Sequence, residues 1–351
     1  MKAQVLKGIE NLSFEEVPLK KPRPGELLIR VRACAICGTD IKIYHHGHRL
    51  ITFPRIPGHE LAGEVVEVGE GVEDFSPGDR VAVAPAVPCG KCYYCLRGEQ
   101  AMCENLRAIG YFWDGGFAEY MRVPREAMVG GCVNKLPESV SFEEGALAEP
   151  LACAINGQEL MRIESGDSVA VIGGGPLGLI HARLSKVKGA GKVILLEVNR
   201  DRLKIAEEKK VGDYYLNPIE EGVKDKIREI TGGRGVDKVI VACGVPDAQK
   251  LALELVAPLG VVNFFGGLPR NFSQVELDTN LIHYKECFVV GTHGSAPQHN
   301  RKALELLEKK LLQVKDIITH RLPLSRLREG MGVVERGEGL KVIINPGEEE
   351  T

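Results

Sequence analysis

Hydrophobic and polar residues follow two different patterns along the chain. As far as about residue 150, short apolar runs are separated by turns rich in glycine and proline, a spacing typical of a compact, partly closed β-structure. The clearest runs are Leu27–Val31, Gly63–Val68 and Arg80–Val83. From about residue 151, apolar strands alternate with amphipathic helices, which predicts a parallel sheet with right-handed crossovers.

The second pattern predicts individual strands and helices. Strands are expected at 169–172, 193–196, 238–242, 260–265 and 287–291. A helix is expected over 246–256, and a further amphipathic helix over about 300–311 follows the last strand. The acidic tail Glu348–Glu350 is expected to be frayed.

A glycine-rich turn joins the first of these strands to a helix. Gly173, Gly175 and Gly178 match the pattern G-x-G-x-x-G, in which the glycines permit the turn, the approach of a pyrophosphate and close helix–strand packing. Glu197 follows the next strand, where a carboxylate can accept hydrogen bonds from the adenosine ribose. The alternative is an ordinary strand–turn–helix unit with a solvent-facing Glu197, but the combination favours a bound dinucleotide.

Length and composition narrow the class of protein. A chain of 351 residues suits two domains, and a formal net charge of −3 gives no electrostatic case for binding nucleic acid or an anionic membrane. No apolar run is long enough to span a membrane, and the N-terminus has no signal-peptide pattern. We therefore expect a cytoplasmic protein.

Four of the ten cysteines form the most specific motif in the chain. Cys89, Cys92, Cys95 and Cys103 have the spacing of a tetrahedral zinc site with four thiolates. An iron–sulfur cluster is the alternative metal assignment, and four free thiols are the alternative without a metal. A closed shell of four cysteines leaves no open position, so a structural role is expected.

A second, more dispersed group of residues offers a thiolate, an imidazole and carboxylates. Cys37, His59 and Glu60 could bind a catalytic zinc with one open position, and Glu149 adds another acid just before the pattern changes. Cys34 and Cys37 also form C-x-x-C, which is compatible with a redox pair. We interpret Cys34 as a buried thiol.

Together these motifs closely resemble the zinc-dependent medium-chain alcohol dehydrogenases over essentially the whole chain. The motifs that carry the resemblance are Cys37–Asp40, Gly58–Glu60 with Gly63, Gly69 and Val72, the four-cysteine lobe, Gly115–Tyr120 and Gly173–Gly178. The resemblance implies an α/β protein in which a GroES-like catalytic domain (1–153, zinc lobe about 86–106) precedes a Rossmann cofactor domain (154–290). Residues 291–351 would return to the catalytic domain, and the chain would form a homodimer or homotetramer.

The resemblance also indicates a branch of the family. Glu149 stands where the alcohol dehydrogenases carry a cysteine, as in sorbitol dehydrogenase and other polyol dehydrogenases. Cys37, His59 and Glu60 would then hold the catalytic zinc, and Glu149 would reach it directly or through water. The bound zinc would lower the pKa of a substrate hydroxyl.

Two positions depart from the family pattern. Lys42 replaces a histidine that passes the substrate proton outward, and His45, His46 or His48 could substitute for it. Ile43, with Tyr44 beside it, replaces a tyrosine that contacts the polyol in animal sorbitol dehydrogenases, which weakens the case for sorbitol itself.

By resemblance, further residues receive roles. Thr39 would take the hydroxyl proton, unless it only caps a helix, and Asp40 would orient a ligand histidine. Leu177 would lie by the pyrophosphate turn, Glu197 and Arg202 by the adenosine, and the nicotinamide half would contact Gly266, Gly267, Leu268, Thr292 and His293. Glu197 favours NAD over NADP, whereas Arg200 leaves NADP possible.

Three functions follow from these assignments. The first is a zinc-dependent polyol dehydrogenase that transfers a hydride to NAD. The second is a dehydrogenase of the same family acting on threonine or another secondary alcohol, such as a 2,3-diol. The third is a non-catalytic zinc- and nucleotide-binding protein, such as a redox-sensing regulator. The intact set of four candidate catalytic-zinc residues argues against the third, and also against a zinc-free quinone reductase of the same fold.

Overall fold

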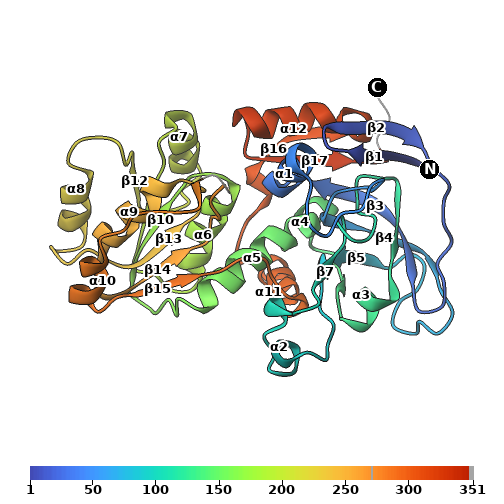
Figure 1. Cartoon of the computed structure of the whole chain (residues 1–351), viewed down its shortest axis with the longest axis horizontal. Helices are drawn as coiled ribbons and strands as arrows, with labels where there is room; N and C mark the ends of the chain where they lie inside the picture. The colour runs from blue at the N-terminus through green and yellow to red at the C-terminus, as the bar shows by residue number, and fades with distance from the viewer. Residues whose placement is uncertain (270–271, 348–351) are drawn as a thin grey trace. The chain divides into compact units, whose positions relative to one another are not determined.

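The computed structural model in Figure 1 describes residues 1–269 and 272–347. The chain divides into two compact units, one formed by Met1–Ala152 with Gly294–Thr351 and the other by Cys153–His293. The acidic tail Glu348–Glu350 lies outside the described residues.

The first unit is built on a seven-stranded sheet with the order β16-β17-β3-β4-β5-β9, in which β8 also pairs with β3. This sheet confirms the β-rich reading of the first part of the chain. It contains β3 (Leu27–Ala35), β4 (Glu60–Val68), β5 (Arg80–Val83), β8 (Tyr120–Val123), β9 (Val133–Lys135), β16 (Ile318–Pro323) and β17 (Lys341–Asn345). Two small sheets pair β1 (Lys2–Gly8) with β2 (Asn11–Glu16), and β6 (Ala86–Val87) with β7 (Arg107–Ala108).

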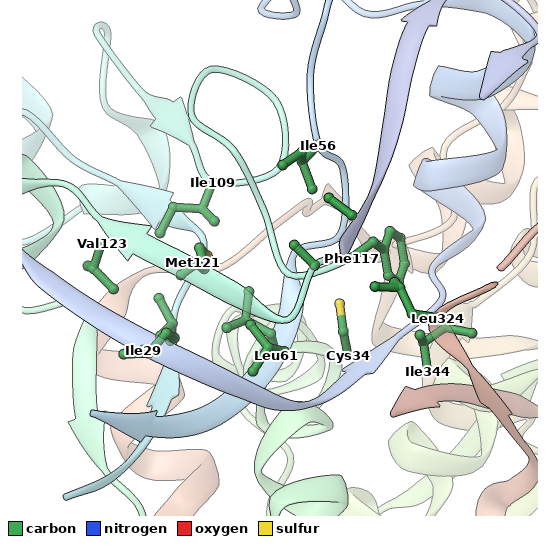
Figure 2. Close-up of a cluster of buried hydrophobic side chains, with 14 of the residues drawn as sticks. Ile29, Cys34, Ile56, Leu61, Ile109, Phe117, Met121, Val123, Leu324 and Ile344 are labelled. Atoms are coloured by element: carbon green, nitrogen blue, oxygen red, sulfur yellow. The ribbon is translucent and has the colours of Figure 1, made fainter. Parts of the chain in front are cut away.

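Apolar side chains on the inner face of this sheet form the core of the first unit. In β3 the residues Leu27, Ile29 and Val31 are fully buried, whereas Arg30 between them is exposed, as expected of a strand with one face covered. The fully buried ring of Phe117 packs in the same cluster, which Figure 2 shows. The core therefore fixes β3 and β4, whose adjoining ends carry Cys37, His59 and Glu60.

The second unit is a six-stranded parallel sheet with the order β12-β11-β10-β13-β14-β15. Its strands are β10 (Ser168–Ile172), β11 (Lys192–Leu196), β12 (Tyr214–Leu216), β13 (Val236–Val241), β14 (Val256–Phe264) and β15 (Phe288–Gly291). This order confirms the predicted doubly wound Rossmann sheet, in which the direction of winding reverses between β10 and β13. The short strand β12 was not predicted, because three residues show no usable periodicity.

Helices complete both units (Figure 1). Those of the second unit are α6 (Pro176–Val187), α7 (Arg200–Glu208), α8 (Val223–Ile230), α9 (Pro246–Leu255) and α10 (Thr279–Lys285). The others are α1 (Gly38–His46), α2 (Tyr93–Leu96), α3 (Arg125–Val129), α4 (Phe142–Ala146), α5 (Ala148–Glu159), α11 (Pro297–Glu308) and α12 (Leu327–Arg336), with short 3₁₀ turns at Gln100–Met102, Lys315–Ile317 and Leu324–Arg326.

Two observations on the helices bear on what the sequence predicted. Helix α11 begins at Pro297 rather than near residue 300, because proline is favoured in the first helical turn, where its missing N–H is not needed. Among the described residues, no helix is both long and apolar enough to cross a membrane.

Candidate functional site

Helix α1 positions the first candidate ligand. Cys37 is its N-cap: the sulfur accepts a hydrogen bond from the backbone N–H of Thr39 (3.4 Å), and the Asp40 carboxylate accepts one from the backbone N–H of Cys37 (2.9 Å). The reciprocal bonds form a capping box, so Cys37 rather than Thr39 caps the helix. The Thr39 hydroxyl oxygen lies 3.5 Å from the Cys37 sulfur.

Asp40 also holds the second candidate ligand. The Nδ1 atom of the buried His59 lies 3.2 Å from the Asp40 carboxylate, so a proton on Nδ1 leaves Nε2 free to bind a metal. Burial alone would lower the pKa of His59, but the charges of Asp40 and Cys37 raise this pKa well above its usual value. The sequence-based expectation that Asp40 orients a ligand histidine agrees with this contact.

The backbone before His59 is tightly constrained. Gly58 has φ of +95°, and a Cβ atom there would lie 2.9 Å from both the Cys34 sulfur and the Phe117 ring. Only glycine fits this position, which ties His59 to the apolar core. Cys34 itself is fully buried, and burial raises the pKa of its thiol well above the usual value, so an inert buried thiol is favoured over a redox pair with Cys37.

Three candidate ligands converge at this point. The potential ligand atoms of Cys37, His59 and Glu60 lie within 4.8 Å of one another. A thiolate, an imidazole and a carboxylate at this separation fit a zinc ion with an open fourth position. Glu149, in the first turn of α5, is buried but does not belong to this set.

A buried lysine neutralises one member of the set. Lys341, in β17, forms an ion pair with the Glu60 carboxylate and donates to the carbonyl oxygen of Ile36 at 3.2 Å. Burial would lower the pKa of Lys341, but the charge of Glu60 raises it. No local pattern indicates this pair, because Glu60 and Lys341 are far apart along the chain.

Tyr111 is a further residue that sequence reasoning missed. Its ring centroid lies 5.2 Å from that of His59 and 5.2 Å from that of His48. Burial and then the acidic groups nearby raise the pKa of Tyr111 well above its usual value. The aromatic run that starts at Tyr111, flanked by Gly110 and Gly115, was the available indication in the sequence.

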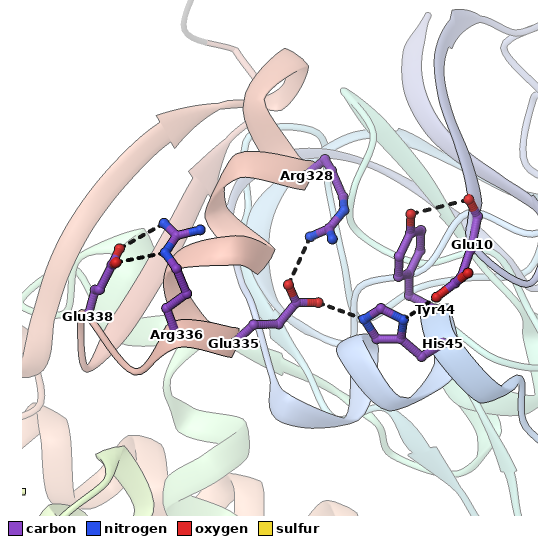
Figure 3. A network of polar contacts seen from close by, with 7 residues as sticks. All are labelled: Glu10, Tyr44, His45, Arg328, Glu335, Arg336 and Glu338. Carbon is purple, nitrogen blue, oxygen red and sulfur yellow. Dashed lines mark hydrogen bonds and ion pairs between the residues drawn. The ribbon is translucent and has the colours of Figure 1, made fainter.

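Tyr44 and His45, which lie near the two departures from the family pattern, contact Glu10 and Glu335 rather than the ligand set (Figure 3). The two ring nitrogens of His45 contact the carboxylates of Glu10 (2.6 Å) and Glu335 (2.8 Å). The Tyr44 hydroxyl donates to the carbonyl oxygen of Glu10 at 3.2 Å. Of the three histidines considered as substitutes for a relay histidine, only His48 has a ring contact that leads to the ligand set, through Tyr111.

The four-cysteine lobe provides the second candidate metal centre. The sulfurs of Cys89, Cys92, Cys95 and Cys103 lie within 4.8 Å of one another, close to the roughly 3.8 Å of a tetrahedron with Zn–S bonds of about 2.3 Å. The backbone N–H of Lys91 lowers the pKa of Cys89 to about 6, whereas burial raises that of Cys95 to about 12. All ten cysteines are free thiols, so these four remain available for a metal.

The glycine motif of the second unit has the geometry of a phosphate-binding turn. Gly173 follows β10 with φ of +113°, and Gly175 caps α6, which starts with Pro176. A Cβ atom on Gly178 would lie 1.7 Å from the carbonyl oxygen of Gly173, so helix and strand could not pack with a larger residue. A Cβ on Gly175 would meet open space, which suits the approach of a pyrophosphate to the helix N-terminus.

The adenosine end of the motif is also consistent with a nucleotide. The buried Glu197 carboxylate accepts hydrogen bonds from the backbone N–H groups of Gly174 (2.6 Å) and Asn199 (2.8 Å). The Nε atom of Arg202 is buried and has no hydrogen-bond partner among the described residues, so a ligand could satisfy it. Arg200 is exposed and forms an ion pair with Glu220 at 3.7 Å.

The residues expected at the nicotinamide half follow two neighbouring strands. Gly266, Gly267 and Leu268 come after β14, and Thr292 and His293 come after β15. The Thr292 hydroxyl forms hydrogen bonds with the Asn263 side chain at 3.0 and 3.1 Å. These positions lie at the carboxyl ends of parallel strands, where doubly wound sheets bind their ligands.

Comparison with known proteins agrees with both units. Residues 23–137 match the model of the alcohol dehydrogenase GroES-like domain, and residues 176–309 match that of the zinc-binding dehydrogenase. L-threonine 3-dehydrogenase of Pyrococcus abyssi is 40% identical over 93% of each chain, and sorbitol dehydrogenase of Halalkalibacterium halodurans is 34% identical over 97% of each chain. A zinc-binding dehydrogenase structure from Sinorhizobium meliloti 1021, bound to NADP, superposes with a TM-score of 0.91 at 35% identity, covering 98% of this chain and 99% of the other.

Proposed function

The chain belongs to the zinc-dependent medium-chain alcohol dehydrogenases, and within this family we propose that it oxidises a secondary hydroxyl of a polyol to a ketone with NAD as acceptor. When bound, zinc supplies Lewis acidity at the substrate hydroxyl and NAD supplies the acceptor for the hydride. The reaction is reversible, and the product is a ketose.

The residues around the candidate catalytic zinc divide the remaining work. We assign Cys37, His59 and Glu60 as its ligands, and Asp40 holds the imidazole of His59 in one orientation. We assign the Thr39 hydroxyl, next to the Cys37 sulfur, as the group that would take the substrate proton and pass its own proton on toward solvent. Glu149 remains a candidate for direct or water-mediated contact with the zinc.

One observation favours a neutral, hydroxyl-rich substrate. The acidic groups Asp40, Cys37, Glu149 and Glu60 act on the Tyr111 hydroxyl beside the ligand set, and Lys341 compensates the charge of Glu60. The carboxylates among these groups can accept hydrogen bonds from several hydroxyl groups of one polyol. This observation carries the choice of a polyol.

L-Threonine is the second candidate, because a relative that is 40% identical is an L-threonine 3-dehydrogenase. Threonine also carries a secondary hydroxyl with a polar group on the neighbouring carbon, so both substrates suit the same reaction. Glu197 near the adenosine end supports NAD in either case, because a carboxylate repels the 2′-phosphate of NADP.

A substrate panel tests the proposal. NADH formation would be followed by absorbance with sorbitol, mannitol, xylitol, galactitol, inositol, 2,3-butanediol and L-threonine, before and after chelation and with zinc returned. We expect a polyol signal that chelation removes and zinc restores. Activity on threonine alone would favour the second candidate, and absence of any signal with zinc and NAD bound would contradict the polyol assignment.

A further inference from the structure

Tyr111 lies beside the candidate catalytic zinc site but has no part in the reaction described so far. It belongs to the loop between β7 and β8, and its ring contacts those of His59 and His48, each at 5.2 Å between centroids. Because His59 is a candidate zinc ligand, the Tyr111 ring borders the site where a zinc-bound substrate hydroxyl would lie.

The loop holds Tyr111 in place before any ligand binds. Gly110 has φ of +84°, and a Cβ atom there would lie 2.9 Å from the carbonyl oxygen of Gly58, so this residue packs directly on the backbone before His59. The N–H of Gly110 donates to the carbonyl oxygen of Trp113 at 2.9 Å, and the guanidinium of Arg107 lies 4.3 Å from the centre of the Phe112 ring. A side chain on such a loop is preorganised for recognition.

The hydroxyl of Tyr111 has capacity to bind a ligand. Within residues 1–269 and 272–347 it forms no hydrogen bond, although the side chain is half-buried. A phenol both donates and accepts hydrogen bonds, so it can pair with a ligand oxygen within its reach.

We propose that the Tyr111 hydroxyl binds the substrate oxygen on the carbon next to the reacting carbon. It thereby selects vicinal diols and polyols over monoalcohols. This inference rests on the proposed function for the identity of the reacting group. One neutral hydrogen bond changes an affinity by roughly tenfold, so the expected selectivity is of that order.

Calorimetry on a complex that cannot react tests the inference. Zinc-loaded protein saturated with NADH would be titrated with 2,3-butanediol and with 2-butanol, which differ by one vicinal hydroxyl. We expect Tyr111→Phe to raise the Kd of the diol roughly tenfold and that of 2-butanol less than about twofold. Tyr120→Phe is the matched control, because the Tyr120 hydroxyl accepts from Arg30 at 3.0 Å, away from the ligand set. Equal zinc contents in all three proteins would exclude loss of the metal.

Several outcomes would overturn the inference: a wild-type protein that binds the diol no tighter than 2-butanol, equal losses for both alcohols in Tyr111→Phe, or no loss for either. The proposed function fails separately. Since NADH cannot accept a hydride, the calorimetry measures binding whether or not the protein oxidises its substrate. Selective binding of the diol, together with no oxidation of any polyol, would contradict only the proposed function.

Discussion

Lys341 and Glu60 form a buried ion pair whose two members depend on each other. Both side chains are almost fully buried, and Lys341 is the cation that contacts a candidate zinc ligand. Removing one partner of a buried pair leaves the other charge uncompensated, which costs about 3–5 kcal/mol. The pair therefore lets both charges be buried inside the fold.

We predict that Lys341→Met lowers the free energy of unfolding of the metal-depleted protein by about 3–5 kcal/mol, because it strands the Glu60 charge. Denaturant unfolding followed by circular dichroism measures this change. Adding Glu60→Gln to the variant should restore part of the loss. The exposed pair Lys204–Glu208 is the control, and Lys204→Met should cost less than about 0.5 kcal/mol. A loss below about 1 kcal/mol for Lys341→Met would contradict the account.

Some residues of the site could be found from the sequence and others could not. Cys37, His59 and Glu60 stand in motifs whose spacing indicates metal binding, and the structure brings their ligand atoms together. Lys341 and Tyr111 occupy no such motif, and only the tertiary fold brings each of them to the ligand set. Their positions depend on the pairing of β17 with β3 and on the docking of one loop, neither of which has a local pattern.

Helix α1 is held at both ends. The capping box fixes its start at Cys37. In its last turn, His45 bridges two carboxylates: that of Glu10, in the turn between β1 and β2, and that of Glu335, in α12 (Figure 3). Arg328 of α12 donates to Glu335 at 3.2 Å and lies over the Tyr44 ring. Both ring nitrogens of His45 can donate only when the imidazole is protonated, so the bridge requires the charged form.

The bridge predicts a pH-dependent stability. Hydrogen bonds to Glu10 and Glu335 raise the pKa of His45, so its contribution is complete below the unfolded value of about 6.5 and is lost as the pH rises through the raised pKa. Burial raises the pKa of Glu335, but His45 and Arg328 lower it by more, so the net shift is downward. The contribution of Glu335 to stability is therefore lost as the pH falls below about 4.5.

We therefore expect His45→Gln to lower the Tm most between about pH 5 and pH 6.5, with the difference from wild type shrinking as the pH rises through the raised pKa of His45. Scanning calorimetry across this range measures it. His46→Gln is the control, because the exposed His46 has a ring contact with His45, whereas His45 alone makes the two contacts that bridge Glu10 and Glu335. A Tm difference that is constant with pH, or that grows as the pH rises, would show that the bridge does not depend on the charged imidazole.

At the level of elements, periodicity predicted the long apolar strands of the second unit well. It missed β12, whose three residues are too few, and placed the start of α11 late, because Pro297 starts the helix before the amphipathic pattern becomes clear. The tight loop around Gly110 depends on contacts with Gly58, which no local pattern reveals.

At the scale of the whole molecule, the described residues include two separate candidate metal centres in the first unit, with different expected roles. The four-cysteine lobe is a closed set, whereas the set around Cys37 leaves a position open for substrate. Loss of one centre should therefore leave the other able to bind zinc.

We predict that Cys103→Ser lowers the zinc content from about two ions per chain to about one and lowers the Tm, because a structural zinc contributes to folding. Elemental analysis and scanning calorimetry measure the two effects. Cys132→Ser is the matched control, since Cys132 is a buried thiol outside both sets, and it should leave the zinc content unchanged. Unchanged zinc content in Cys103→Ser, or loss of all zinc, would contradict two independent centres.

Transfer of deuterium tests the central claim most directly. A polyol deuterated at its secondary carbons would be incubated with the zinc-loaded protein and NAD, and the reduced nicotinamide would be examined by mass spectrometry. The proposed function predicts that each reduced cofactor carries one deuterium, because the hydride leaves the carbon that becomes the ketone. Reduced cofactor without deuterium, or no reduction by any polyol, would contradict it.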